Sequence, residues 1–408
     1  MVMQAGWFAM RRPSITALVL ALVLGGGSTV GAGVTAGAAG GALPPGRIPL
    51  AARPAGTNLD REVFGFFLPS ERDHLLHEAD FSVLSTIAFF GIQANAWGQL
   101  VTHVHGSNQP TSRWAAWRSP KMDRIINKAH AAGTRVVLTV TKFAWDSTAA
   151  YQSSINLLSH PKRRHSLAQQ IAAEVVQRGV DGVNIDFEPI PFAVKDQFVT
   201  FVHELRRALD NRQRGLELTV AATGYISNYE AGGIVSAGGA DAIYVMAYPY
   251  HGVWSTTTGN ISPLTRPGYD LHDTIKTYEA AGAPASKLIL GLPYYGYEWT
   301  TKTGTYGAAV VPNEPRGSIL YHSAMDIAAA HGSLWNTTEQ APWSRWQSRD
   351  CATCPLLWRE LYYDDVQSYG LKFDLINTRN LRGLGIWTLG FEGSRTELNT
   401  LIRDRFGS

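Results

Sequence analysis

Cysteine is scarce in this sequence, which limits the metal and redox chemistry that it can support. Cys351 and Cys354 are the only two cysteines among 408 residues. A zinc site would need two further ligands at short spacing, and none of the twelve histidines falls into such an array, so we expect no metal and no cofactor. The surrounding stretch is rich in Trp and Pro and lacks the strand and helix of a redox C-x-x-C motif, which favours a local disulfide between the two residues.

Charge of either sign is also sparse. Charged residues make up 17% of the chain, and 36 basic against 33 acidic residues leave a net charge of +3. No basic stripe and no nucleic-acid-reading motif is present, so we expect no nucleic-acid partner. Hydrophobic residues, at 45%, are plentiful enough to offset the entropy of ordering the chain, which excludes a disordered protein.

The apolar run near the N-terminus is too short for a resident membrane helix. It covers residues 15–24, whereas a membrane-spanning helix needs about 20 apolar residues. Arg11 and Arg12 precede this run and the small-residue triplet at 36–38 follows it, an order typical of an export signal. We therefore predict a signal peptide at 1–38, a linker rich in Ala, Gly and Pro at 39–60, and a secreted, extracellular or cell-wall associated protein without stable membrane insertion. An uncleaved anchor is the alternative.

Beyond residue 60, short β-rich apolar runs alternate with helical patterns. Their near-continuous Val, Ile and Leu content is typical of strands buried on both faces of a parallel sheet. Eight such units predict an α/β fold, a (β/α)8 TIM barrel over residues 61–408, with an open doubly wound sheet as the structural alternative. The predicted strands are 63–68, 84–90, 135–141, 182–188, 216–223, 242–248, 288–294 and 384–389.

The connection after the seventh predicted strand is too long for an ordinary loop. We predict an insertion at residues 297–362 within the barrel domain. Segments that follow barrel strands emerge at the catalytic face, so the insertion is expected to form one wall of a substrate cleft.

The most informative stretch is residues 181–188, which read DGVNIDFE. Side chains alternate along a strand, so Asn184, Asp186 and Glu188 share one face while apolar side chains occupy the other. In a barrel the apolar set packs on the helices, and the polar set points into the lumen with Glu188 nearest the catalytic end. Two carboxyl groups crowded together raise the proton affinity of one of them, which keeps a general acid protonated near neutral pH.

The same stretch resembles the D-x-x-D-x-D-x-E signature of glycoside hydrolase family 18, the chitinase-like hydrolases of N-acetylglucosamine polymers. Three further segments are similar to family motifs and follow in the expected order on later barrel strands. The resemblance covers residues 62–406, and four motifs in register are far more specific than one. The three segments are YVMAY at 244–248, LGLPYYG at 290–296 and GLGIW at 383–387.

This resemblance implies a retaining, substrate-assisted hydrolysis of β-1,4 linkages next to N-acetylglucosamine, in chitin oligomers or peptidoglycan. Glu188 would protonate the glycosidic oxygen, while Asp186 holds the acetamido N–H of the sugar and Tyr248 donates to its carbonyl. Trp387 would form the floor under the reactive sugar. The expected partner is an N-acetylglucosamine-containing polysaccharide, bound by a monomer. The other substrate-binding positions are Asn184, Met246, Tyr295 and Phe66.

Three departures from the family pattern leave a second function open. Asn184 replaces the middle Asp of the signature, Pro249 replaces the Asp that usually follows the sixth-strand Tyr, and residues 135–141 lack the S-x-G-G of many chitinases. The alternative to an enzyme is therefore a catalytically weak or inactive, lectin-like carbohydrate-binding protein. A metal-dependent sugar deacetylase is disfavoured, because no D-H or H-x-x-x-H constellation accompanies the predicted barrel.

Overall fold

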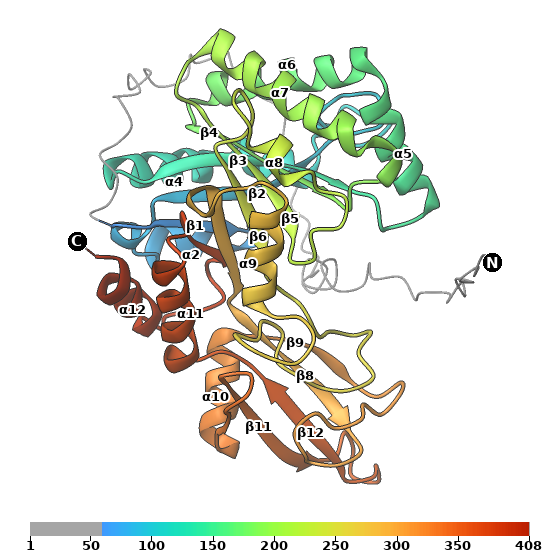
Figure 1. Ribbon diagram of the computed structural model, residues 1–408, viewed down its shortest axis with the longest axis vertical. Helices are drawn as coiled ribbons and strands as arrows, with labels where there is room; N and C mark the ends of the chain where they lie inside the picture. The colour runs from blue at the N-terminus through green and yellow to red at the C-terminus, as the bar shows by residue number, and fades with distance from the viewer. Residues whose placement is uncertain (1–58, 408) are drawn as a thin grey trace, which may run out of the picture.

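The computed structural model describes residues 59–407, which form a closed barrel with a second, smaller sheet inserted into it (Figure 1). The predicted signal peptide at 1–38 and the predicted linker up to residue 58 lie outside the described residues. Within the described part of the chain, no helix is both long and apolar enough to cross a membrane.

Eight parallel strands close the barrel, which confirms the predicted TIM-barrel fold and excludes the open doubly wound sheet. The last strand, β13, pairs with both β7 and β1, so the barrel has no free edge. We predicted that the sixth strand extends to residue 248, but β6 ends at Met246, because the backbone turns there and the N–H of Ala247 donates to the carbonyl of Val245 at 2.8 Å. The barrel strands are β1 (Glu62–Phe67), β2 (Thr86–Gln93), β3 (Arg135–Phe143), β4 (Gly182–Glu188), β5 (Glu217–Thr223), β6 (Ala242–Met246), β7 (Leu288–Pro293) and β13 (Gly383–Trp387).

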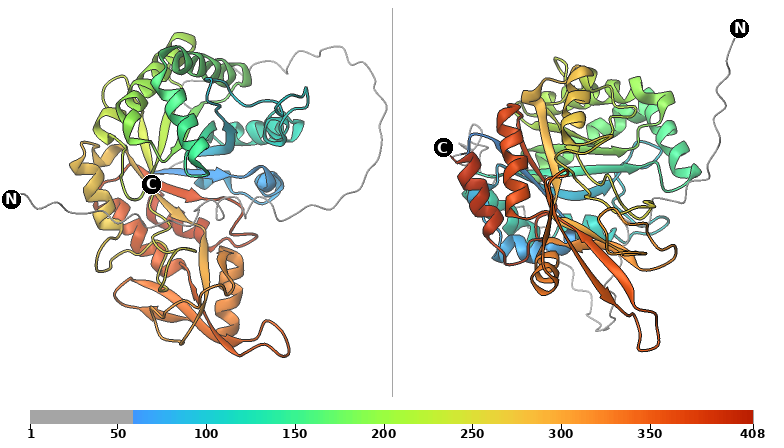
Figure 2. Two further views of the ribbon diagram at one scale, coloured as in Figure 1. Left: turned by 90° about the vertical axis from the view of Figure 1, so that its right-hand side faces the viewer. Right: turned by 60° about the horizontal axis from the view of Figure 1, so that its bottom comes forward.

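Helices cover the outside of the barrel between successive strands (Figures 1 and 2). Local sequence sets their ends. Gly179 closes α6 with a φ of 70°, in the left-handed region that favours glycine, and Asp365 and Ser368 form a capping box at the start of α11. The α-helices of the barrel are α2 (Arg72–His77), α3 (Ser112–Trp117), α4 (Pro120–Ala131), α5 (Thr148–Ser159), α6 (Pro161–Arg178), α7 (Lys195–Arg212), α8 (Ala231–Ile234), α9 (Leu271–Ala280), α11 (Val366–Thr378) and α12 (Glu397–Phe406).

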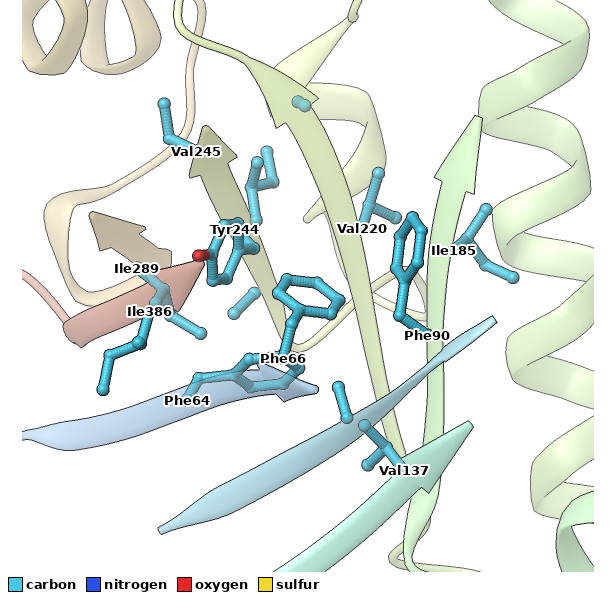
Figure 3. Close-up of a cluster of buried hydrophobic side chains, with 14 of the residues drawn as sticks. Phe64, Phe66, Phe90, Val137, Ile185, Val220, Tyr244, Val245, Ile289 and Ile386 are labelled. Atoms are coloured by element: carbon cyan, nitrogen blue, oxygen red, sulfur yellow. The ribbon is translucent and has the colours of Figure 1, made fainter. Parts of the chain in front are cut away.

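Aromatic side chains fill one part of the barrel lumen, where Phe64, Phe66, Phe90 and Tyr244 lie among aliphatic residues (Figure 3). The ring of Phe66 lies 4.8 Å from that of Tyr244 and 5.3 Å from that of Phe64, measured between centroids. Gly291 and Gly385 make room for Tyr244, because a Cβ on either glycine would collide with its ring. The glycines of the seventh- and eighth-strand motifs therefore serve packing of the lumen.

The amino ends of the strands meet in a ring of four buried or nearly buried charges, which we call the ion ring: Glu62, Arg135, Glu217 and Arg382. Arg135 lies 2.6 Å from Glu62 and 2.7 Å from Glu217, measured between charged atoms. Arg382 lies 2.5 Å from Glu62 and 2.8 Å from Glu217. Each carboxylate thus contacts two guanidinium groups, and the four residues come from β1, β3, β5 and the residue before β13.

The insertion after β7 is a five-stranded antiparallel sheet, which lies below the barrel in Figure 1. Its first strand begins at residue 295, two residues before the predicted start of the insertion, so Tyr295 belongs to the inserted sheet. Trp299 and Trp343 are buried in it. The sheet order is β10-β11-β12-β8-β9, and the elements are β8 (Tyr295–Thr301), β9 (Arg316–Leu320), α10 (Tyr321–His331), β10 (Leu334–Asn336), β11 (Ala341–Ser348) and β12 (Leu357–Tyr362).

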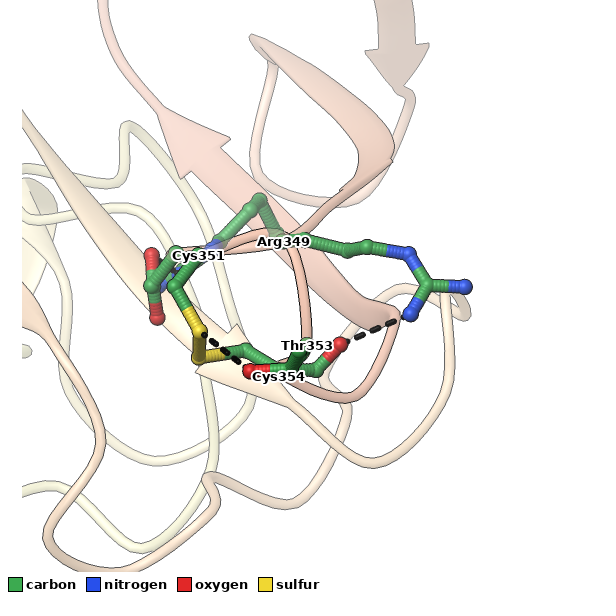
Figure 4. The surroundings of a disulfide bond; sticks show 6 residues. Arg349, Cys351, Thr353 and Cys354 are labelled. Atoms are coloured by element: carbon green, nitrogen blue, oxygen red, sulfur yellow. Dashed lines mark hydrogen bonds and ion pairs between the residues drawn. A yellow bond between two sulfur atoms is a disulfide. The ribbon is translucent and has the colours of Figure 1, made fainter.

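Cys351 and Cys354 form a disulfide in the turn between β11 and β12, with their Cα atoms 5.0 Å apart (Figure 4). Arg349 donates a 2.7 Å hydrogen bond from its side chain to the carbonyl of Cys354 and closes the same turn. The turn is mostly exposed, and neither cysteine contacts the barrel strands that carry the other predicted site residues.

Candidate active site

Strand β4 brings three polar side chains into the lumen. Asn184, Asp186 and Glu188 are all buried, and Glu188 is the last residue of the strand, at the carboxyl end of the barrel. The alternate residue Phe187 points outward and stacks on Phe201 of α7, with ring centroids 5.6 Å apart. The alternation fixes which face is polar, and the outward apolar packing holds the carboxyl groups inward.

Asp186 and Glu188 form a buried carboxyl pair. Burial raises the pKa of Asp186 to about 7, and a hydrogen bond from Glu188 partly opposes this shift. The pKa of Glu188 is raised well above its ordinary value by burial, by the charge of Asp186 and by the hydrogen bond between the two carboxyl groups. Among the described residues, neither carboxyl forms an ion pair with Lys, Arg or His. Near neutral pH the pair therefore retains a proton, and Glu188 is the member able to donate it at the open end of the barrel.

Hydroxyl and amide groups surround this pair. Asn184 donates a 2.8 Å hydrogen bond to the hydroxyl of Thr219 on β5. The carboxamide oxygen of Asn184 and the Oδ1 atom of Asp186 are buried without a hydrogen-bond partner among the described residues, as are the hydroxyls of Thr139 and Thr141 on β3. The carboxyl pair therefore lies in a polar part of the lumen, which contrasts with the aromatic part around Phe66.

Two tyrosines on the β6 side complete the polar part. The hydroxyls of Tyr244 and Tyr248 lie 3.3 Å apart, and the half-buried ring of Tyr248 meets Tyr295 edge to face at 6.3 Å. Burial raises the pKa of Tyr248 well above its ordinary value, helped by the neighbouring Tyr244, so its phenol stays protonated and can donate a hydrogen bond. Met246 ends β6, is also half-buried and shares the lumen face of that strand with Tyr244.

Trp387 ends β13 as a half-buried indole held by two phenylalanines. Its ring centroid lies 5.5 Å from that of Phe66 and 4.7 Å from that of Phe90 on β2. The aromatic contacts continue from Phe90 to Phe143 at 6.4 Å, and from Phe143 to Trp145 at 5.3 Å. An aromatic wall thus runs from Trp387 across the ends of β2 and β3, and flat apolar faces of this kind suit the apolar face of a sugar ring.

The structure brings the predicted barrel residues together and adds others that the sequence reading did not assign. Glu188, Asp186, Tyr248 and Trp387 lie at or near the carboxyl ends of barrel strands, and Asn184 lies deeper in the lumen, in the middle of β4. The pair Cys351 and Cys354 does not join them. The additional residues are Tyr244, Thr219, Phe90, Phe143 and Trp145. Of these, Tyr244 could have been found from strand alternation with Met246, whereas the others depend on register between distant strands.

The described residues contain no cluster of three or more His, Cys, Asp or Glu side chains that could hold a metal ion. The donor set at the carboxyl end consists of two carboxyl groups that share a proton and of hydroxyl and amide groups. These groups suit proton transfer and hydrogen bonding to a substrate.

Comparison with known proteins gives one family and a consistent fold. Residues 74–392 match the model described as Glycosyl hydrolases family 18. The Bacillus subtilis protein YdhD, named as a sporulation-specific glycosylase, is 29% identical over 247 residues, which are 58% of this chain and 53% of that protein. The cortical fragment-lytic enzyme of the same organism is 25% identical over 306 residues, 71% of this chain and 64% of that enzyme. An endochitinase of Manduca sexta is 25% identical over 281 residues, 61% of this chain and 50% of that enzyme.

The alignments thus span between half and two thirds of these curated relatives. Among solved structures, a mutant chitinase from Cycas revoluta in complex with an N-acetylglucosamine tetramer superposes with a TM-score of 0.71 at 20% identity, covering 84% of this chain and 99% of that one. The class V chitinase of Nicotiana tobaccum gives a TM-score of 0.70 at 21% identity, over 84% of this chain and 98% of that one. At this identity the structural likeness concerns the fold.

Proposed function

Because the chain belongs to the glycosyl hydrolases family 18, we propose that it cleaves β-1,4 linkages next to N-acetylglucosamine in chitin oligomers or peptidoglycan. One observation carries the proposal beyond the family. The carboxyl pair of Asp186 and Glu188 is buried at the carboxyl end of the barrel, lacks a cationic partner among the described residues, and has the raised pKa values that a general acid needs. A buried acid of this kind, beside an indole floor and a tyrosine hydroxyl, fits acid-catalysed cleavage of a sugar linkage.

In the first proposed step, the bond between the anomeric carbon and the glycosidic oxygen breaks. Glu188 transfers its proton to that oxygen, and the leaving sugar departs as an alcohol. The carbonyl oxygen of the substrate's own 2-acetamido group forms the new bond to the anomeric carbon and gives a cyclic oxazolinium ion. Asp186 accepts the acetamido N–H and balances the positive charge, while Tyr248 donates its hydroxyl hydrogen bond to hold the acetamido group in position.

In the second step, water opens the oxazolinium ion. Glu188, now a carboxylate, takes a proton from water, whose oxygen attacks the anomeric carbon and displaces the acetamido oxygen. The product keeps the original anomeric configuration, and Glu188 regains the proton that it donated. Trp387 supports the reactive ring throughout, since its indole is half-buried and leaves part of its surface accessible.

The departures from the family pattern modify this site without removing its acid. Asn184 stays buried and bonds to Thr219, so it keeps a polar lumen contact while removing one charge. Pro249 follows Tyr248 directly and supplies no carboxylate to the sugar. We propose further that the protein acts outside the cell, which is supported by the export-signal pattern of residues 1–38.

Hydrolysis of chromogenic chitobioside and chitotrioside by the wild type and by Glu188→Gln tests the assignment of the acid. We expect the substitution to lower kcat by about a hundredfold to ten-thousandfold, because it removes proton transfer and keeps the shape of the side chain. Asp404→Asn, which removes an exposed carboxylate on α12, serves as the matched control and should match the wild type. Equal release by the wild type and Glu188→Gln would contradict the proposal, and binding of chitotetraose without any release would favour the lectin-like function.

A second experiment identifies the polymer and tests substrate assistance. Chitin and purified peptidoglycan are digested side by side, and the new reducing ends are identified by mass analysis. Each polymer is also supplied after removal of its acetyl groups. We expect the deacetylated glycans to resist cleavage, because they lack the acetamido oxygen that attacks the anomeric carbon. Equal cleavage of acetylated and deacetylated chains would exclude the substrate-assisted mechanism.

A further inference from the structure

Arg113 lies beside the aromatic wall of the candidate site. It belongs to α3, in the segment between β2 and β3, and its guanidinium carbon is 5.8 Å from the ring centroid of Phe90. It also donates a 3.3 Å hydrogen bond to the carbonyl of Gly91. The ring of Phe90 is in turn 4.7 Å from the indole of Trp387. Arg113 is therefore held one aromatic side chain away from the proposed sugar floor.

This arginine has no carboxylate partner, although it is partly buried. No Asp or Glu oxygen among the described residues lies within ion-pair distance of it, whereas Arg118 on the same segment pairs with Glu174. Burial lowers the pKa of Arg113, and no nearby acid opposes that shift. A charged group that is partly removed from water without a counter-ion is costly, and this cost is common at binding sites.

The unused donors of Arg113 are not fully enclosed by the described residues. A guanidinium carries five N–H donors, and one hydrogen bond to Gly91 accounts for one of them. None of the Arg113 nitrogens belongs to the buried side-chain atoms that lack a partner within the described residues, so the remaining donors are accessible to a ligand. A planar guanidinium with free donors is the side chain best suited to bind a carboxylate with two parallel hydrogen bonds.

Arg113 lies at the catalytic end of the barrel. Segments that follow barrel strands emerge at the carboxyl end, where Glu188 ends β4, so α3, which follows β2, lies at the same end as the carboxyl pair.

We propose that Arg113 determines specificity by pairing with a carboxylate on the bound polysaccharide, so that the preferred substrate is an acidic N-acetylated glycan and not neutral chitin. The lactyl group of N-acetylmuramic acid, which alternates with N-acetylglucosamine in peptidoglycan, is a carboxylate of this class. This inference rests on the proposed function, because it places the glycan at the carboxyl end of the barrel, against Glu188 and Trp387. It concerns recognition only and leaves the chemistry at Glu188 unchanged.

The test is a binding measurement in the Glu188→Gln background, in which turnover is blocked. The probes are a tetrasaccharide of alternating N-acetylglucosamine and N-acetylmuramic acid, the same tetrasaccharide with its lactyl carboxylates converted to amides, and chitotetraose. We expect the protein to bind the acid form about tenfold more tightly than the amide form. Adding Arg113→Gln should remove this preference, and Arg113→Lys should retain part of it. Arg124→Gln, an exposed arginine on α4, is the charge-matched control and should keep the full preference.

The acid-to-amide ratio separates recognition from a structural role, because loss of packing around Phe90 would weaken both forms equally. Equal affinity for the two forms in the Glu188→Gln background, or an unchanged preference after Arg113→Gln, would overturn the proposal. If Arg113→Gln fails to fold, Arg113→Lys replaces it in the test. This variant should lose part of the preference for the acid form, and an unchanged acid-to-amide affinity ratio would overturn the proposal. Failure of the proposed function is distinguished separately, since it appears as the absence of Glu188-dependent hydrolysis of every glycan.

Discussion

The two ends of the barrel each bury a pair of carboxyl groups, but they provide opposite environments. At the amino end, burial alone would raise the pKa of Glu62, yet Arg382 and Arg135 together bring it below its ordinary value. At the carboxyl end, burial and the neighbouring Asp186 raise the pKa of Glu188, and no cation opposes the shift. The same residue type at similar depth is thus a structural anion at one end and a proton donor at the other. For these two glutamates the counter-ions decide which it is, whereas at Glu217 burial and the charge of Glu62 outweigh the same two arginines and raise its pKa to about 7.

The two ends also differ in what their carboxyl groups have as partners. The ion ring pairs two guanidinium groups with two carboxyl groups, although burial and the charge of Glu62 raise the pKa of Glu217 to about 7. The carboxyl pair has no such cationic partner among the described residues and needs either a proton or a substrate group as its partner. An acetamido N–H is a partner of the second kind.

The largest effect is expected from breaking the ion ring. Arg382→Gln should lower the free energy of unfolding by about 3–5 kcal/mol, because it leaves two buried carboxylates with one guanidinium between them. The folded fraction should retain the wild-type kcat, since the ring lies at the opposite end from Glu188. Urea unfolding and turnover per folded molecule measure the two quantities, with Arg124→Gln as the exposed control. A change in the free energy of unfolding no larger than that of the control would show that the ion ring does not stabilise the amino end of the barrel.

At the carboxyl end, Asp186→Asn should lower kcat by about a hundredfold, because it removes the group that stabilises the positive intermediate. It should also move the alkaline limb of the pH profile to lower pH. Asp186 raises the pKa of Glu188, so without its charge Glu188 loses its proton at lower pH. Stability should be unchanged or slightly higher, in contrast to the ion ring. An alkaline limb that stays in place would show that the two carboxyl groups titrate independently.

Several buried carboxyl groups contribute to the pH dependence of stability, because burial raises the pKa of Glu217 and of Glu360 to about 7 as well, so the difference between the wild type and Glu188→Gln isolates the part due to Glu188. Asp186 and Glu188 bind a proton more tightly in the folded than in the unfolded chain, so their contribution is full below about pH 4.5 and is lost as pH rises toward and above 7. We therefore expect the Tm to fall over this range, and to fall less in Glu188→Gln. Calorimetry of the two proteins between pH 4.5 and 8 measures the difference. Parallel curves would contradict the raised pKa of Glu188.

The smallest effect is expected in the inserted sheet. Replacing Cys351 and Cys354 by Ser should cost at most about 2 kcal/mol, because the disulfide closes a very short loop. Hydrolysis and the pH profile should match the wild type, since the turn lies away from both ends of the barrel. Thermal unfolding with and without reductant checks this, and a loss of hydrolysis would mean that the turn reaches the substrate.

The residues of the carboxyl pair could be predicted from the sequence, because they follow one another within a single strand. The alternation of Asn184, Asp186 and Glu188 is enough to place them on one face, and the eight apolar runs are enough to predict the closed barrel. The ion ring was not predicted. Glu62 and Arg382 are 320 residues apart in the chain and meet only because β1 pairs with β13.

Arg113 was missed for a similar reason. Its place beside Phe90 depends on how the segment after β2 folds back over the barrel, and no periodic pattern encodes that path. The start of the inserted sheet at residue 295 was missed because Tyr295 follows the apolar seventh strand without a turn signal, so the sequence does not mark where one sheet ends and the other begins.

The protonation state of Glu188 tests the account most directly. Isotope-edited infrared spectra of the wild type and Glu188→Gln at pH 6 should differ by one protonated carboxyl band, which is present in the wild type and absent in the variant. An ordinary glutamate, with a pKa of about 4.3, would be ionised at this pH. Spectra without that band in the wild type would show a carboxylate at position 188 and contradict the account.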